Sequence, residues 1–144
     1  MKKQRILLGA AFLLAASAVP AAAQDAGDAA NGEKVFKKCM ACHRVGEGAK
    51  NLVGPVLNNV IGRKAGTVEG YKYSELNHHA GEAGLVWDEK KIQEYLPDPN
   101  AFLKKFLTDA GKADQATGST KMTFKLPNEK DRADVVAYLK TFSK

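Results

Sequence analysis

Both cysteines of this 144-residue chain stand in one short stretch, KCMACH, from Lys38 to His43. Two residues separate Cys39 from Cys42, and His43 follows directly. Thiols and imidazoles bind metals, form disulfides and attach cofactors, and their spacing helps to distinguish these chemistries.

Three of these chemistries need features that the rest of the sequence supplies poorly. A structural zinc site takes four ligands, and the remaining histidines, His78 and His79, are adjacent instead of spaced as a ligand pair. A thioredoxin-like dithiol expects a βαβ setting, but strand-like alternation is scarce. A disulfide between the two cysteines would close a very small loop, stabilise little and leave His43 unexplained.

Covalent attachment of a c-type haem accounts for all three residues. Two thiols at this spacing on a helical turn can reach the two vinyl groups on one side of a porphyrin. The next residue, His43, then presents its imidazole to the iron from one face. This is the interpretation we favour, with the three others as alternatives.

The haem iron has a second axial position, for which Met122 is the favoured ligand. The other methionines are the initiator and Met40, which lies inside the motif. Met122 stands in an irregular stretch, TKMTF, whereas a methionine that only fills a core gap is expected on a helix stripe. His78 and His79 are the rival candidates.

A histidine–methionine pair predicts electron transfer and not catalysis. The thioether raises the potential of the iron, and both axial positions are closed to oxygen and peroxide. Two alternatives need an accessible iron. One is a peroxidase-like enzyme that uses His78 or His79, and the other is a ligand-binding or sensing haem module.

The first 23 residues have the pattern of a secretory signal peptide. MKKQR is a basic start, ILLGAAFLLAASAV is an apolar run, and Ala21 and Ala23 resemble a cleavage site. We expect this segment to be removed and residues 24–144 to form one exported domain. An N-terminal membrane anchor is the alternative.

The charge of the chain is modest once this segment is removed. Loss of Lys2, Lys3 and Arg5 reduces 22 basic residues to 19 against 16 acidic ones, and the formal charge falls from +6 to +3. Nucleic-acid-binding proteins concentrate Lys and Arg on one face of a recognisable module. The sequence shows no such module, so we expect no nucleic-acid partner.

Apolar periodicity predicts an all-α domain. Helices are expected over about 31–39, 88–96, 100–111 and 128–142, with short helical turns at 56–60 and 74–79. Asp28 or Asn31, Asp88, Asn100 and Asn128 are the expected N-caps. Gly32 in the first helix suggests close approach by another helix, and the long glycine-rich loops need something to pack around.

At this point the sequence resembles the class I c-type cytochromes, specifically the bacterial cytochrome c2 group, close to mitochondrial cytochrome c. The matching stretches are CMACH, GPVLNNVIGRKAG, GYKYSELN, EYLPDP, TKMTF and DVVAYL. The resemblance implies a small all-α fold wrapped around one haem, with crossing N- and C-terminal helices. Extra residues in GEAGLVW and the long stretch NAFLKKFLTDAGKADQATGS depart from the mitochondrial pattern.

The resemblance also implies a role for each residue around the haem. One haem c per chain would be bound through two thioethers at Cys39 and Cys42, with His43 and Met122 as axial ligands. Pro55 would support His43 through its carbonyl, and Tyr95 would lie near the methionine sulfur. The residues expected near the haem propionates are Arg63, Tyr73, Asn77 and Trp87.

The resemblance finally implies a soluble, monomeric, periplasmic one-electron carrier. It would take electrons from cytochrome bc1 and pass them to a photosynthetic reaction centre or a terminal oxidase. Positive charge around the exposed haem edge would steer acidic partners. The lysines expected there are Lys37, Lys38, Lys121 and Lys125, with Lys104 and Lys105 as further candidates. General solubility is the alternative role for any one of them.

Overall fold

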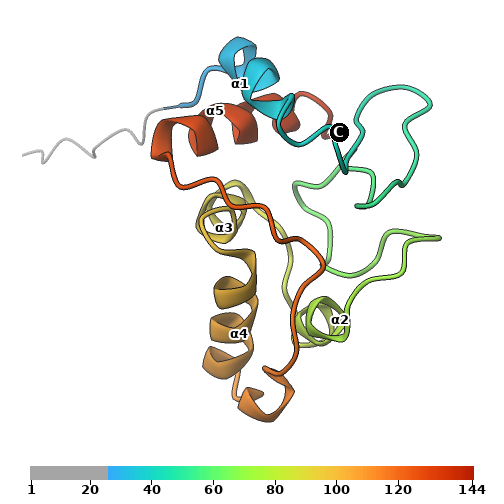
Figure 1. Ribbon diagram of the computed structural model, residues 1–144, viewed down its shortest axis with the longest axis vertical. Helices are drawn as coiled ribbons and strands as arrows, with labels where there is room; N and C mark the ends of the chain where they lie inside the picture. Colours follow the sequence, from blue (N-terminus) through green and yellow to red (C-terminus); the bar gives the residue numbers. More distant parts are fainter. Residues whose placement is uncertain (1–25) are drawn as a thin grey trace, which may run out of the picture.

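The computed structural model describes residues 26–144, which form five α-helices and one short 3-10 helix joined by long loops (Figure 1). The expected signal segment, residues 1–23, lies outside the described residues. The only β-structure within 26–144 is an isolated antiparallel bridge between Lys64 and Val86. The expected all-α class is therefore confirmed. The elements are α1 (Ala29–Phe36), α2 (Glu75–Glu82), α3 (Glu89–Tyr95), α4 (Pro99–Asp109), η1 (Ala113–Gln115) and α5 (Glu129–Lys140).

Each α-helix begins after a residue whose side chain accepts a backbone N–H of the first turn. The expected caps Asp28, Asp88 and Asn128 are confirmed. The expected cap of α4, Asn100, is wrong, because Asp98 accepts the hydrogen bond from the N–H of Ala101. Pro99 fills the first helical position, where its missing N–H costs nothing.

Several expected boundaries also shift. The first helix ends at Phe36 and not near Cys39, and the chain continues through hydrogen-bonded turns to residue 42. The stretch 56–60 contains a turn and no helix. The expected turn at 74–79 extends into the full helix α2, capped by Ser74. None of the helices within 26–144 combines the length and apolar character needed to cross a membrane.

The terminal helices α1 and α5 pack across each other at one end of the molecule (Figure 1). Gly32 makes this approach possible, since a Cβ at this position would lie 1.9 Å from the backbone oxygen of Asp134. One turn later the ring of Phe36 lies 5.5 Å from that of Tyr138. The expectation that Gly32 admits another helix is confirmed.

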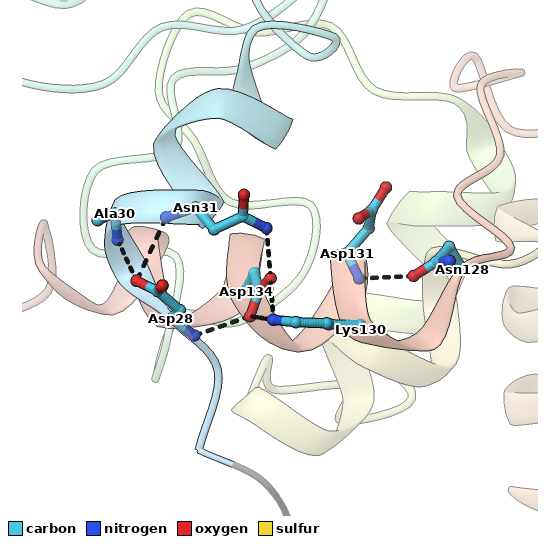
Figure 2. A network of polar contacts seen from close by, with 7 residues as sticks. All are labelled: Asp28, Ala30, Asn31, Asn128, Lys130, Asp131 and Asp134. Atoms are coloured by element: carbon cyan, nitrogen blue, oxygen red, sulfur yellow. Dashed lines mark hydrogen bonds and ion pairs between the residues drawn. The ribbon is translucent and has the colours of Figure 1, made fainter.

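The core is built from the apolar faces of these helices. In α4 the apolar periodicity predicts a buried stripe of Phe102, Leu103, Phe106, Leu107 and Ala110. Leu103 and Leu107 are completely buried and the two phenylalanines are half-buried, but Ala110 is exposed. In α5 the same periodicity predicts a buried stripe of Val135, Tyr138, Leu139 and Phe142. Val135 and Leu139 are buried and the two aromatic residues are half-buried, and the buried face also includes Asp134 and Val136. The buried carboxylate of Asp134 lies in a network of polar contacts between α1 and α5 (Figure 2).

Candidate functional site

A cavity lies between the crossed terminal helices, α3 and the loops that connect them. Its aliphatic and aromatic walls include Phe36, Leu57, Ile92 and Leu139. All the residues expected to bind or surround the cofactor also line this cavity, although they are scattered from position 39 to position 122. They are Cys39, Cys42, His43, Pro55, Arg63, Tyr73, Asn77, Trp87, Tyr95 and Met122.

His43 is held in one orientation by the loop that follows it. Its Nδ1 lies 2.7 Å from the carbonyl oxygen of Pro55. Because that oxygen can only accept, Nδ1 carries the proton and the lone pair of Nε2 is free for a metal. Gly54 also lies close against the ring, and a Cβ there would lie 2.4 Å from the imidazole Cε1. Gly54 in turn donates its N–H to the carbonyl of Cys42 at 2.9 Å.

The surroundings of His43 also favour its neutral, metal-binding form. Burial is the main influence and lowers the pKa of His43, and the nearby Arg63 guanidinium acts in the same direction. The Pro55 carbonyl opposes this shift without cancelling it. A neutral imidazole is the form that binds metal ions.

Cys39 and Cys42 lie on the hydrogen-bonded turns that continue from α1. The N–H groups of Cys42 and His43 both donate to the carbonyl of Cys39, at 3.0 and 2.9 Å. Burial raises the pKa of the Cys39 thiol to about 11. Redox-active dithiols depend on a low thiol pKa, so this environment disfavours a thioredoxin-like role.

Met122 lies on the same cavity as His43 and is contacted by Tyr95. The Tyr95 hydroxyl donates a hydrogen bond to the Met122 Sδ at 3.5 Å. Burial raises the pKa of Tyr95 to about 12, so the hydroxyl keeps its proton and stays a donor. The ring of Tyr95 packs edge-on against Trp87, with 4.9 Å between centroids. A thioether held at the cavity wall is thus available as a soft metal ligand.

The rival ligands His78 and His79 are not among the residues that line the cavity. His78 is exposed and lies 3.3 Å from Glu82, one turn along α2. His79 lies 3.9 Å from Glu75 on the same helix. Neither histidine is placed to share a metal with His43.

Arg63 gives the cavity an unmatched positive charge. Its guanidinium donates to the carbonyl oxygens of Val56 and Asn58, both at 3.1 Å. Within residues 26–144 no carboxylate lies within ion-pair distance of this half-buried cation. A cation withdrawn from water calls for an anion, and the propionates of a haem would supply one.

The donor set therefore fits a haem better than a bare metal ion. Two thiols, one imidazole with a free Nε2, one thioether and one unmatched guanidinium line a mostly apolar cavity. A bare ion would need a compact ligand cluster, and residues 26–144 contain no group of three or more His, Cys, Asp or Glu side chains able to hold one. The zinc interpretation is thereby disfavoured.

The four lysines expected at the docking surface are all exposed, but only two line the cavity. These are Lys38 and Lys121. Lys38 lies 3.2 Å from Asp131, and Lys125 lies 2.5 Å from Asp98. The ammonium of Lys121 lies 5.7 Å from the centroid of the Tyr71 ring.

Sequence reasoning missed three residues that shape this cavity. At Gly54 the absence of a side chain lets the ring of His43 approach the backbone. Thr120, two residues before Met122, donates its hydroxyl to the Oδ1 of Asn77 at 2.8 Å. Tyr71 also lines the cavity. The Gly54–Pro55 pair is a sequence signal for a special backbone position, but no local pattern indicates a role for Thr120 or Tyr71.

The chain matches the family model "Cytochrome c" over residues 29–143. It is 69% identical to cytochrome c2 iso-1 of Rhodospirillum centenum over 117 residues, which cover 81% of this chain and 98% of the relative. It is 68% identical to a cytochrome c2 of Rhodopseudomonas palustris over 114 residues, which cover 79% and 97%. The chain belongs to the class I cytochrome c family, in its cytochrome c2 group.

Solved structures of cytochrome c2 show the same fold. The structure from Rhodospirillum centenum superposes with a TM-score of 0.81 at 69% identity, covering 82% of this chain and 100% of the other. The ferricytochrome c2 structure from Rhodopseudomonas palustris gives 0.76 at 65% identity, covering 81% and 99%. The expected cytochrome c fold is therefore confirmed, including the contact between its terminal helices.

Membership of the cytochrome c2 group establishes the general function. These proteins are electron carriers and not enzymes, so the peroxidase-like alternative is set aside. The cofactor is haem c, which the family attaches covalently to the CxxCH motif, present here as Cys39, Cys42 and His43.

Proposed function

We propose that this cytochrome c2 is a monomeric periplasmic one-electron carrier whose haem iron is ligated by His43 and Met122. Electrons would come from cytochrome bc1 and pass to a photosynthetic reaction centre or a terminal oxidase. One observation carries the proposal. The imidazole of His43, bonded to Pro55, and the sulfur of Met122, bonded to Tyr95, line one cavity. The two cysteines of the motif line the same cavity.

Haem c, when bound, supplies an iron that gains or loses one electron without making or breaking covalent bonds. The chain's part is to hold its own side chains still while this happens. Pro55 fixes the ring of His43, and Tyr95 holds the thioether of Met122. Closely packed neighbours such as Gly54 limit movement of the ring. His43 and Met122 would together hold the iron and leave no open position for oxygen or peroxide.

Arg63, Tyr73 and Trp87 would hold the propionates of the haem. Arg63 brings a positive charge without an acidic partner in the described part of the chain. Burial raises the pKa of Tyr73, so its hydroxyl remains protonated and can donate. Pairing propionates with these groups avoids the cost of burying uncompensated charge.

The lysine surface would select acidic partners. Lys37, Lys38, Lys121 and Lys125 are all exposed. The contacts of Lys38 with Asp131 and of Lys125 with Asp98 are surface ion pairs, which stabilise a fold by little and exchange readily for a partner's carboxylates. Steering by such charges speeds encounter while leaving affinity modest enough for turnover.

Export is the remaining part of the proposal. The signal-like residues 1–23 would direct the chain to the periplasm and then be removed, leaving a domain of residues 24–144. Covalent attachment at Cys39 and Cys42 would keep the cofactor from being lost there.

Replacement of the axial sulfur tests the ligand assignment. In the matured ferric protein, Met122→Ala should abolish the weak red absorption band of iron–thioether bonding and accelerate cyanide binding. His79→Ala is the matched control, because the rival histidine does not line the cavity, and it should change neither property. A Met122→Ala protein that retains the band would refute ligation by Met122.

The partner assignment is tested by reduction with purified cytochrome bc1 at increasing ionic strength. The bimolecular rate should fall as salt rises, and Lys121→Ala should lower it at low salt. Lys140→Ala removes a lysine that does not line the cavity and pairs with Glu89 at 2.6 Å, so it should have a smaller effect. A rate that ignores salt would exclude steering by lysines.

A further inference from the structure

Met122 stands in an irregular segment, residues 120–126, that is buried only at its two ends. Thr120 and Leu126 are 7% and 4% exposed, whereas Lys121 and the residues from 123 to 125 are exposed. No helix or sheet hydrogen bonds stabilise the segment between them. Side-chain contacts of Met122 with Tyr95 and of Lys121 with the Lys72 carbonyl hold its middle, and the rest of its position depends on what holds the two ends.

The far end is held by the junction between α3 and α4. The N–H of Leu126 donates to the carbonyl of Leu96 at 2.8 Å. The ammonium of Lys125 lies 2.5 Å from the carboxylate of Asp98. Both partners belong to the few residues that connect the two helices.

The near end is held by the first turn of α4, through Asn100. The Oδ1 of Asn100 accepts the backbone N–H of Thr120 at 3.1 Å. The hydroxyl of Thr120 donates to Asn77 at 2.8 Å and accepts the N–H of Met122 at 3.4 Å. A chain of hydrogen bonds thus runs from Asn100 to the backbone of Met122.

Asn100 is free for this contact because it does not cap its own helix. Asp98 supplies the cap of α4, through the N–H of Ala101 at 2.9 Å. Asparagine inside a helix is less favourable than alanine. The bond to Thr120 gives this residue a function that its own helix does not require.

We propose that Asn100 is a positioning residue for Met122. Residues 96–100 hold the segment that carries Met122 at both of its ends. The inference rests on the proposed ligation of the iron by Met122. Without the Asn100 acceptor, the N–H of the buried Thr120 loses its partner in the closed state, and the segment opens more often. An opened segment carries the sulfur away from the cavity.

The test uses the matured holoprotein and two measurements. Amide hydrogen exchange of Thr120 and Met122 reports opening of the segment, and the cyanide-binding rate of the ferric protein reports departure of the sulfur. Asn100→Ala should accelerate both by about fivefold, the effect of losing one hydrogen bond. Asn100→Asp keeps an acceptor oxygen and should stay within about twofold of the wild type. Alanine is a strong helix former, so we expect the Asn100→Ala protein to fold.

Asn31→Ala is the matched control. It removes a different asparagine bond, to Asp134 at 2.6 Å, at the contact between α1 and α5. It should lower the unfolding midpoint without selectively accelerating exchange at Thr120 and Met122. Equal acceleration in both alanine variants, or an Asn100→Asp protein that behaves like Asn100→Ala, would overturn the proposal. So would faster exchange with an unchanged cyanide rate, because Asn100 would then not control the sulfur.

The Met122→Ala protein separates this inference from the proposed function. If it binds cyanide no faster than the wild type, Met122 does not occupy the sixth position. That result defeats the ligand assignment and, with it, the positioning of a ligand by Asn100. If it binds cyanide faster but Asn100→Ala does not, only the role of Asn100 fails.

Discussion

The carboxylate of Asp134 in α5 accepts the backbone N–H of Asp28, the cap of α1, at 2.8 Å across 106 positions of sequence. The same carboxylate accepts the side-chain amide of Asn31 at 2.6 Å and the ammonium of Lys130 at 2.8 Å (Figure 2). Asp134 is 1% exposed. One buried acid therefore ties the start of the first helix to the last helix, beside the Gly32 crossing.

Replacing this carboxylate should destabilise the fold strongly. Asp134→Ala leaves the N–H of Asp28 and the amide of Asn31 without their acceptor, and we expect the free energy of unfolding to fall by about 2–3 kcal/mol. Lys130 is mostly exposed, so Lys130→Ala should destabilise the fold much less. Urea unfolding of the holoprotein measures both. An equal loss of unfolding free energy in both variants would mean that Asp134 stabilises the fold through its exposed ion pair with Lys130 and not as a buried acceptor.

Acid should weaken the same contact. Hydrogen bonds from Lys130, Asp28 and Asn31 lower the pKa of Asp134 from its ordinary 3.8 to about 2. A lowered folded-state pKa stabilises the protein above the unfolded pKa, and this contribution is lost as the pH falls from about 4 to about 2. The difference in unfolding free energy between wild type and Asp134→Asn should be constant above about pH 5 and shrink across that window. A constant difference down to pH 2 would contradict this.

Gly32→Ala should destabilise the protein, although alanine usually stabilises a helix when it replaces glycine. In an exposed helix, replacing glycine with alanine stabilises by about 1 kcal/mol. Here the new methyl would lie 1.9 Å from the backbone oxygen of Asp134, so α1 and α5 must separate. We expect a loss of about 1–3 kcal/mol in thermal unfolding of the holoprotein. Glu33→Ala, at the exposed neighbouring position, should change stability by less than about 0.5 kcal/mol.

Tyr95→Phe should lower the reduction potential by a few tens of millivolts. The Tyr95 hydroxyl donates to the Met122 sulfur and draws electron density from it. With Met122 as the proposed ligand, loss of that donor would make the sulfur bind Fe(III) more strongly, and the oxidised state would gain stability. Tyr71→Phe is the matched control, because its hydroxyl donates to the carbonyl of Val53 at 2.8 Å and not to the sulfur. A redox titration in which both variants shift alike would rule out this effect.

Much of the local architecture could be read from neighbouring residues. The caps Asp28, Asp88 and Asn128 satisfy N–H groups two or three positions away, and the stripe of Leu103 and Leu107 repeats with the helical turn. The CxxCH motif identifies its cofactor for the same reason, since the three reactive side chains lie within five positions. At α4 a local signal was available but not used. Asp98 and Asn100 are equally good caps by residue type, but Pro99 is favoured directly after a cap and so indicates Asp98. The contact of Asn100 with Thr120, in contrast, spans 20 positions and has no local signal.

Contacts between residues far apart in the sequence could be seen only in the tertiary structure. Asp134 looks like one polar residue among several on its helix, and it is buried because α1 packs over it. Met122 and His43 line one cavity only because loops and helices between them fold back on each other. Caps and helical periodicity arise from interactions between residues within about four positions, so the local sequence predicts them. Burial and shared cavities arise from packing between segments far apart in the chain, and the local sequence does not say which segments will meet.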